Sequence, residues 1–138
     1  MGTFRRVVTG HRADGTSIIA SDTAVKSTEV PGLGGIELGT LWASDHTFKY
    51  PDDGREAPPS TWFPPIGGVR FIEFVLPAGS DPEKAASAGG DMDAAEQAAP
   101  GLLSHFTADA PGMHRSETCD MLYIVSGRCV LELDDGSA

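Results

Sequence analysis

The chain has 138 residues, which suits a single domain because most domains span about 100 to 150 residues. Its 20 acidic and 10 basic residues give a formal charge of -10, which argues against a nucleic-acid partner, since a phosphate backbone is bound by clustered Lys and Arg. The chain contains neither an apolar run of about 18 residues nor a signal-peptide pattern, so we expect a cytoplasmic protein without a membrane partner. The 17 glycines and 10 prolines are typical of short strands joined by tight turns. Composition therefore predicts a mainly β fold.

The first elements in chain order predict an antiparallel hairpin. Residues 4–9 and 16–20 are rich in strand formers and flank the turn signal Ala13-Asp14-Gly15. Residues 24–30 form a candidate extended strand. Residues 36–43 form another, whose alternation of apolar and polar side chains is clear only as far as Thr40. We expect the hairpin to be an arm attached to the main sheet.

A long loop is predicted over residues 44–66, because five prolines exclude a regular helix or a central strand. Loops of this length often carry function, which makes Trp62 and Phe63 candidates for a lid or a subunit contact. The alternative is that both aromatic side chains fasten the loop to the sheet. His46 is expected to be a solvated loop histidine.

Residues 68–76 give the strongest central-strand pattern, and the only charges in this strand, Arg70 and Glu73, are predicted at its rim. Residues 77–90 lack periodicity and predict a flexible linker. A short helix is expected near residues 91–106, with Asp91 or Asp93 as its N-cap and Glu96 completing a capping box with Asp93. We expect helix to be confined to this region and to occupy under about 15% of the chain.

The last 27 residues join a polar cluster to a predicted β-hairpin. Residues 121–125 and 128–133 have strand patterns around a Ser126-Gly127 turn, and a second turn signal stands at residues 134–136. In this pairing Cys119 and Cys129 do not face each other, so no disulfide between them is expected. His114 and Asp120 stand at the mouth of the first strand.

The segment from Pro111 to Gly136 resembles a degenerate first cupin motif, which is a Gly, five residues, His-x-His, three or four residues, Glu, six residues and Gly. Asp120 is followed after six residues by Gly127, and it takes the place of the Glu. His114 falls on the first His and Ser116 on the second. The chain is also similar to small single-domain cupins that have Met-His-x-Thr/Ser-x-Thr-x-Asp before the same hairpin.

This resemblance implies a cupin-type jelly-roll β-barrel with His114 and Asp120 as metal ligands. Imidazole and carboxylate together suit one divalent Fe, Mn, Zn, Ni or Co ion. The second cupin motif, which carries a further His ligand, has no counterpart within the 138 residues. We therefore expect a C-terminally truncated domain with an incomplete barrel, or, as the alternative, a barrel completed by another copy.

Two classes of function follow. The first is a metal-dependent enzyme of the oxygenase, decarboxylase or isomerase type that acts on a small organic molecule, with Tyr123 and Trp62 shaping the pocket. The second is a metal-free cupin that binds a small ligand or serves as a dimeric accessory protein, with Ser116, Arg115 and Tyr123 in the pocket. A Cys119 nucleophile activated by His114 is a distant third.

Two further expectations concern geometry. His114 and Asp120 should point into one end of the barrel, within reach of a common ligand or of each other; the alternative is a hydrogen-bonded pair that only tightens a turn. A homodimer is expected in which residues 4–20 contact the other subunit, because the N-terminal hairpin lacks a partner in the abbreviated barrel.

Overall fold

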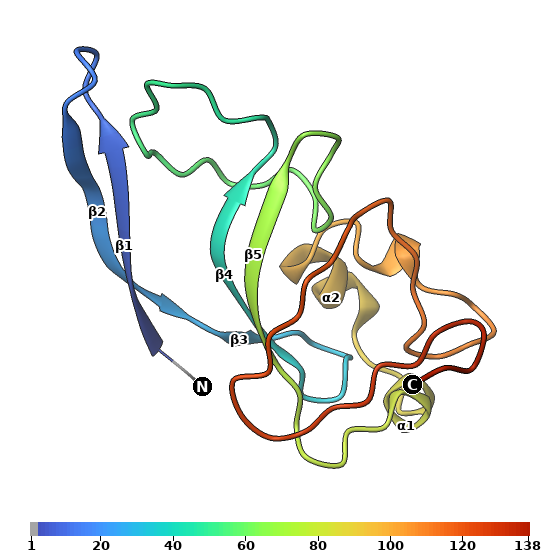
Figure 1. Ribbon diagram of the computed structural model, residues 1–138. Helices are drawn as coiled ribbons and strands as arrows, with labels where there is room; N and C mark the ends of the chain where they lie inside the picture. The colour runs from blue at the N-terminus through green and yellow to red at the C-terminus, as the bar shows by residue number, and fades with distance from the viewer. Residues whose placement is uncertain (1–2) are drawn as a thin grey trace.

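The computed structural model describes residues 3–138 and is mainly β (Figure 1). The described residues form a two-stranded and a three-stranded antiparallel sheet, and neither closes into a barrel. The elements in chain order are β1 (Thr3–His11), β2 (Ser17–Lys26), β3 (Thr28–Glu29), β4 (Glu37–Ser44), β5 (Val69–Val75), α1 (Pro82–Ser87), α2 (Met92–Ala98) and the 3₁₀ turn η1 (Leu103–His105). The predicted fold class is confirmed at this level.

The N-terminal hairpin, formed by β1 and β2, is confirmed. Its turn lies where predicted, with Gly15 in the left-handed region at φ 84° and the Asp14 carboxylate accepting a hydrogen bond from the Thr16 amide at 2.9 Å. β2 extends to Lys26, and so it absorbs the start of the strand predicted over residues 24–30. The two strands pair over their whole length, with a register shift after Val8.

The second sheet has the strand order β3-β4-β5. β4 and β5 lie within one residue of the strands predicted over residues 36–43 and 68–76. Their register shifts between Thr40 and Trp42, so the strand bulges at the point where the alternation in the sequence weakens. Because directly paired residues share a face, Trp42 and Phe71 lie on one face of this sheet, and Leu38 and Phe74 on the other.

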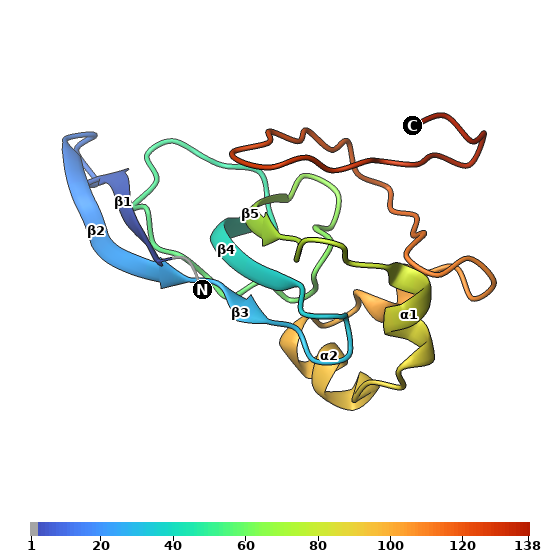
Figure 2. The same ribbon diagram turned by 90° about the horizontal axis from the view of Figure 1, so that it is seen from below.

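The core lies on the Leu38 face of the sheet, where α2 covers it (Figure 2). Val30, Leu38 and Ala95 are buried together, and five partly buried side chains pack around them: Leu33, Ile36, Trp62, Ile72 and Leu103. The Asp91 carboxylate caps α2 by accepting from the Ala94 amide at 2.9 Å. The predicted capping box is wrong, because Glu96 accepts from the Gly101 amide at the opposite end of the helix.

Helix is not confined to the predicted region, because α1 lies inside the segment expected to be a flexible linker. The Asp81 carboxylate accepts from the Lys84 amide at 3.2 Å. Asp81 thus caps the helix and Pro82 opens it, a combination that favours helix initiation. Both signals are present in the sequence, within a segment whose Gly, Ala and Ser content is typical of a linker.

The strands predicted over residues 121–125 and 128–133 are not formed. The chain bends at Ser126-Gly127 as expected, with Gly127 at φ 78°, but no backbone hydrogen bonds join the two segments in the part of the chain that the structure describes. Figure 2 shows this antiparallel pair on the side of β4 and β5 opposite α2. A two-stranded hairpin with nothing packed on either face is at best marginally stable in water, which accounts for the missing ladder.

Candidate functional site

His114 lies in a tight hairpin formed by residues 105–115. The Thr107 amide donates to the Met113 carbonyl at 2.8 Å, the Arg115 amide donates to the His105 carbonyl at 3.0 Å, and Phe106 and His114 form a β-bridge. Gly112, at φ 85°, supplies the left-handed residue of the turn. The hairpin places His105 and His114 on the same part of the surface, although eight residues lie between them in the sequence.

Phe63 of the Pro-rich loop lies against both of these histidines. Its ring centroid is 4.4 Å from that of His105 and 5.9 Å from that of His114. Phe106 packs edge-on against His114 at 5.9 Å. These four residues, Phe63, His105, Phe106 and His114, are called the aromatic cluster below. All except the exposed His114 are half-buried.

The backbone orients the two imidazole rings. His105 Nδ1 lies 2.6 Å from the Arg115 carbonyl oxygen, and His114 Nδ1 lies 3.4 Å from that of Gly112. A carbonyl can only accept, so a neutral ring in this position carries its proton on Nδ1 and keeps Nε2 as an acceptor. The aromatic cluster therefore combines an apolar wall with two nitrogen acceptors.

The other predicted site residues are not joined to this cluster. The Ser116 hydroxyl lies 2.6 Å from that of Thr118, and both Asp120 and Tyr123 are exposed. Over residues 3–138, no hydrogen bond or ring contact connects His114 with either Asp120 or Tyr123. The inward-facing geometry predicted for His114 and Asp120 is not formed, because no barrel closes around them; their roles stay predictions.

Trp62 fastens the loop, as the alternative interpretation proposed. Its side chain packs on the core, and its amide donates to the Pro100 carbonyl at 2.6 Å. It also borders a hollow of about 70 Å³, together with Thr40, Pro59, Thr61, Arg70, Ile72, Ala98 and Pro100. A hollow of this size suits a few water molecules rather than an organic ligand.

The side chains that could bind a metal ion lie apart from one another in the part of the chain that the structure describes. A catalytic site commonly uses three protein ligands. Within residues 3–138, no three side chains of His, Cys, Asp or Glu are grouped so that they could hold one ion. The described residues therefore do not form a three-ligand centre. Cys119 and Cys129 are exposed free thiols.

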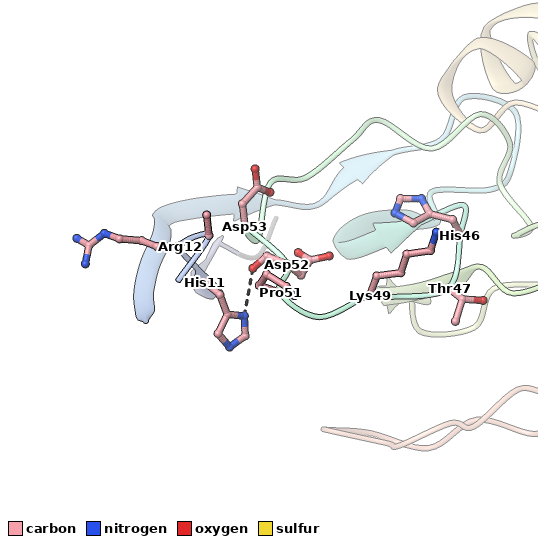
Figure 3. A pocket seen from close by; sticks show the side chains of 9 residues that line it. His11, Arg12, His46, Thr47, Lys49, Pro51, Asp52 and Asp53 are labelled. Carbon is pink, nitrogen blue, oxygen red and sulfur yellow. Dashed lines mark hydrogen bonds between the residues drawn. The ribbon is translucent and has the colours of Figure 1, made fainter. Parts of the chain in front are cut away.

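Sequence reasoning missed an open cleft of about 850 Å³ between the hairpin tip and the Pro-rich loop (Figure 3). Its lining includes two histidines, one arginine, one lysine and two aspartates. The full set of lining residues is His11, Arg12, Ala13, His46, Thr47, Lys49, Pro51, Asp52 and Asp53. One oxygen of Asp52 and one of Asp53 accept from the amides of Gly54 and Arg55, and the other oxygen of Asp53 pairs with the Arg55 guanidinium. His46 is exposed, as predicted.

The wall of this cleft depends on close backbone packing. A Cβ on Gly10 would lie 2.3 Å from the Asp53 carbonyl oxygen, and one on Gly54 would lie 2.7 Å from that of Thr9. The His11 amide donates to the Asp52 carbonyl at 2.6 Å. Two glycines thus let the loop lie directly on β1. The turn signal Asp52-Asp53-Gly54 is visible in the sequence, but neither it nor the lone Gly10 indicates that the loop lies on β1.

Comparison of the chain with protein-family models, curated proteins and solved structures gives no match. Among residues 3–138, no helix is both long enough and apolar enough to cross a membrane.

Proposed function

We propose that the protein binds a small organic molecule at the aromatic cluster, on a scaffold of the cupin jelly-roll type. The observation that carries the proposal is the position of Phe63 against both His105 and His114. An apolar wall with a few convergent polar groups is the usual composition of a small-molecule site. Antiparallel sheets with a short helix on one face support the scaffold, although they are also found in other β folds.

His114 is the residue shared by the sequence resemblance and by the cluster. In this proposal its Nε2 contacts the ligand, Phe63 provides the apolar wall, and Ser116 borders the site from the end of the hairpin. Asp120 and Tyr123 would have to approach from the C-terminal segment. The protein is proposed to act in the cytoplasm and as a homodimer.

The alternative is a metal-dependent enzyme of the oxygenase, decarboxylase or isomerase type, with His114 and Asp120 among the ligands of Fe, Mn, Zn, Ni or Co. It rests on the resemblance to the first cupin motif. Elemental analysis of protein purified without chelators tests it directly. An equimolar metal that is lost in both His114→Ala and Asp120→Ala would favour the enzyme, whereas a metal-free wild-type protein would contradict it.

Ligand-observed NMR with a library of small aromatic acids and amides tests the binding proposal. Compounds that bind the wild-type protein should lose binding in His114→Ala and in Phe63→Leu. His46→Ala is the matched control, because His46 is also exposed but lies in the cleft lining. Equal loss in all three variants, or retention in all three, would contradict a site at the aromatic cluster.

A further inference from the structure

The protein exposes far more surface than a compact chain of its mass. Its accessible surface is 10068 Å² for 14.4 kDa. A compact monomer of this mass exposes about 6,800 Å², so the excess is roughly 3,000 Å². An excess of this size leaves room for a partner surface, and covering its apolar part would add to stability, because burial of apolar area is the main favourable contribution to folding and association.

Much of the exposed apolar area lies in one segment. The C-terminal strand pair, residues 121–125 and 128–133, exposes Met121 by 95%, Tyr123 by 89% and Val125 by 87%. Five more of its apolar side chains are also more than one-third exposed: Leu122, Ile124, Val130, Leu131 and Leu133. Phe71 and Val69 of β5 are exposed on the sheet face that α2 leaves uncovered. Contiguous patches of this kind mark interaction surfaces.

We propose that the C-terminal strand pair is the self-association surface of the protein and that a second copy of the same chain covers it. The pair offers unbonded backbone as well as apolar side chains, because its two segments make no hydrogen bonds with each other. Pairing with the equivalent segments of a second copy forms the missing ladder and buries the side chains in one step. The resulting contact is isologous, as in a two-fold dimer.

The charge distribution favours a like partner at this place. The chain carries a net charge of -10, so two copies repel each other over most of their surfaces. The strand pair contains only two charged residues, Arg128 and Glu132, and they carry opposite signs. Depletion of charge is characteristic of the centre of an interface. The C-terminal strand pair is thus a long segment on which two copies meet with little repulsion.

The area also matches a dimer. A standard interface removes about 800 Å² from each partner, and obligate homodimers bury about 2,000 to 5,000 Å² in total. An excess of roughly 3,000 Å² per chain is enough for an obligate interface.

The N-terminal hairpin is a weaker candidate for the dimer interface, because Arg6 already ties it to the Leu41 carbonyl and to Glu56 within the same chain.

Light scattering at micromolar concentration, combined with hydrogen exchange, tests this proposal. The wild-type protein should have twice the 14.4 kDa chain mass, and the amides of residues 121–125 should be protected. The double variant Val125→Asp/Leu131→Asp should be monomeric and lose this protection. Its circular dichroism should lose only the strand signal of residues 121–133, because both side chains are exposed and lie outside β1 to β5. These positions avoid the proposed ligand contacts, so a failure of this test leaves the binding test standing.

Two matched controls test whether the dimer interface lies at the C-terminal strand pair rather than elsewhere on the surface. Ile66→Asp changes an equally exposed side chain in the Pro-rich loop, and Ile19→Asp changes one on the N-terminal hairpin. Both variants should remain dimeric. A monomeric or open-ended wild-type assembly would overturn the proposal, as would a dimer that survives the double variant. Dissociation by Ile19→Asp alone would move the interface to the hairpin.

Discussion

The guanidinium of Arg70 and the carboxylate of Asp45 form an ion pair with an N–O distance of 2.5 Å, which ties the Pro-rich loop to β5. The Arg70 side chain is only 6% exposed, against 29% for Asp45. Arg70 also donates to the carbonyls of Thr61 and Trp62 in the loop and to that of Ser44 at the end of β4. The prediction that Arg70 lies at the rim was wrong, because a guanidinium with this many acceptors can be desolvated.

We expect Arg70→Met to destabilise the protein by about 3 kcal/mol, since it leaves several part-buried carbonyls, and the Asp45 oxygen that faces Arg70, without their donor. Arg70→Lys should recover only a small part of this lost stability, because a single ammonium group cannot reach all the acceptors that surround the planar guanidinium of Arg70. Urea unfolding gives the free energies. Proteolysis of residues 44–66 should accelerate in both variants. These contacts of Arg70 with Asp45, Thr61, Trp62 and Ser44 are called the Arg70 clamp below. An Arg70→Lys variant as stable as the wild-type protein would contradict their proposed contribution to stability.

Acid should weaken the same clamp over a definite range. Hydrogen bonds from Ser60, followed by the contact with Arg70, lower the pKa of Asp45 from 3.8 to about 2. A carboxyl group whose pKa is lower in the folded than in the unfolded protein stabilises the fold at pH values above its unfolded pKa. This stabilisation is lost as the pH falls from 3.8 towards 2. The stability difference between the wild-type protein and Asp45→Asn should therefore shrink across this range. Asp109→Asn, at an exposed site outside the clamp, should show a smaller change.

Local patterns were sufficient to predict β1, β2, β4 and β5, because each strand combines β-formers with a nearby turn signal. Even the bulge after Thr40 was visible as a loss of alternation. The C-terminal strand pair shows the limit of such reasoning. Its segments have clear strand patterns, but strand formation depends on a neighbouring surface that sequence periodicity does not specify.

The candidate site was predicted less completely than the fold. His114 was identified from its place in the motif, and Phe63 from its place in a long loop. Their contact was not foreseen, since it joins segments about 50 residues apart through the docking of the loop. His105 was missed although Pro111-Gly112 is a turn signal that brings the two histidines together across the hairpin.

The N-cap of α2 offers a test with a matched control. Asp91→Ala should cost about 1 kcal/mol, because the Ala94 amide loses its acceptor. Asp93→Ala removes a carboxylate of equal charge from the first turn without removing the cap, and it should cost less than half as much. Urea unfolding measures both values. A larger loss in Asp93→Ala would place the cap at Asp93, as the capping-box prediction had it.

Phe63→Leu should release both histidines of the aromatic cluster while the loop stays in place. The ring of Phe63 lies close enough to His105 and His114 to shift the NMR signals of their Cε1 protons by its ring current. In Phe63→Leu both signals should move towards their positions in short peptides, and binding of small aromatic ligands should fall at least tenfold, which corresponds to about 1.4 kcal/mol.

The Arg70 clamp does not involve the Phe63 ring, so proteolysis of the loop should not accelerate in Phe63→Leu. Phe48→Leu, at an exposed phenylalanine of the same loop, is the control and should leave both signals and binding unchanged. If the signals of only one histidine moved, the two rings would not share Phe63 in solution, and the proposed site would lose its apolar wall.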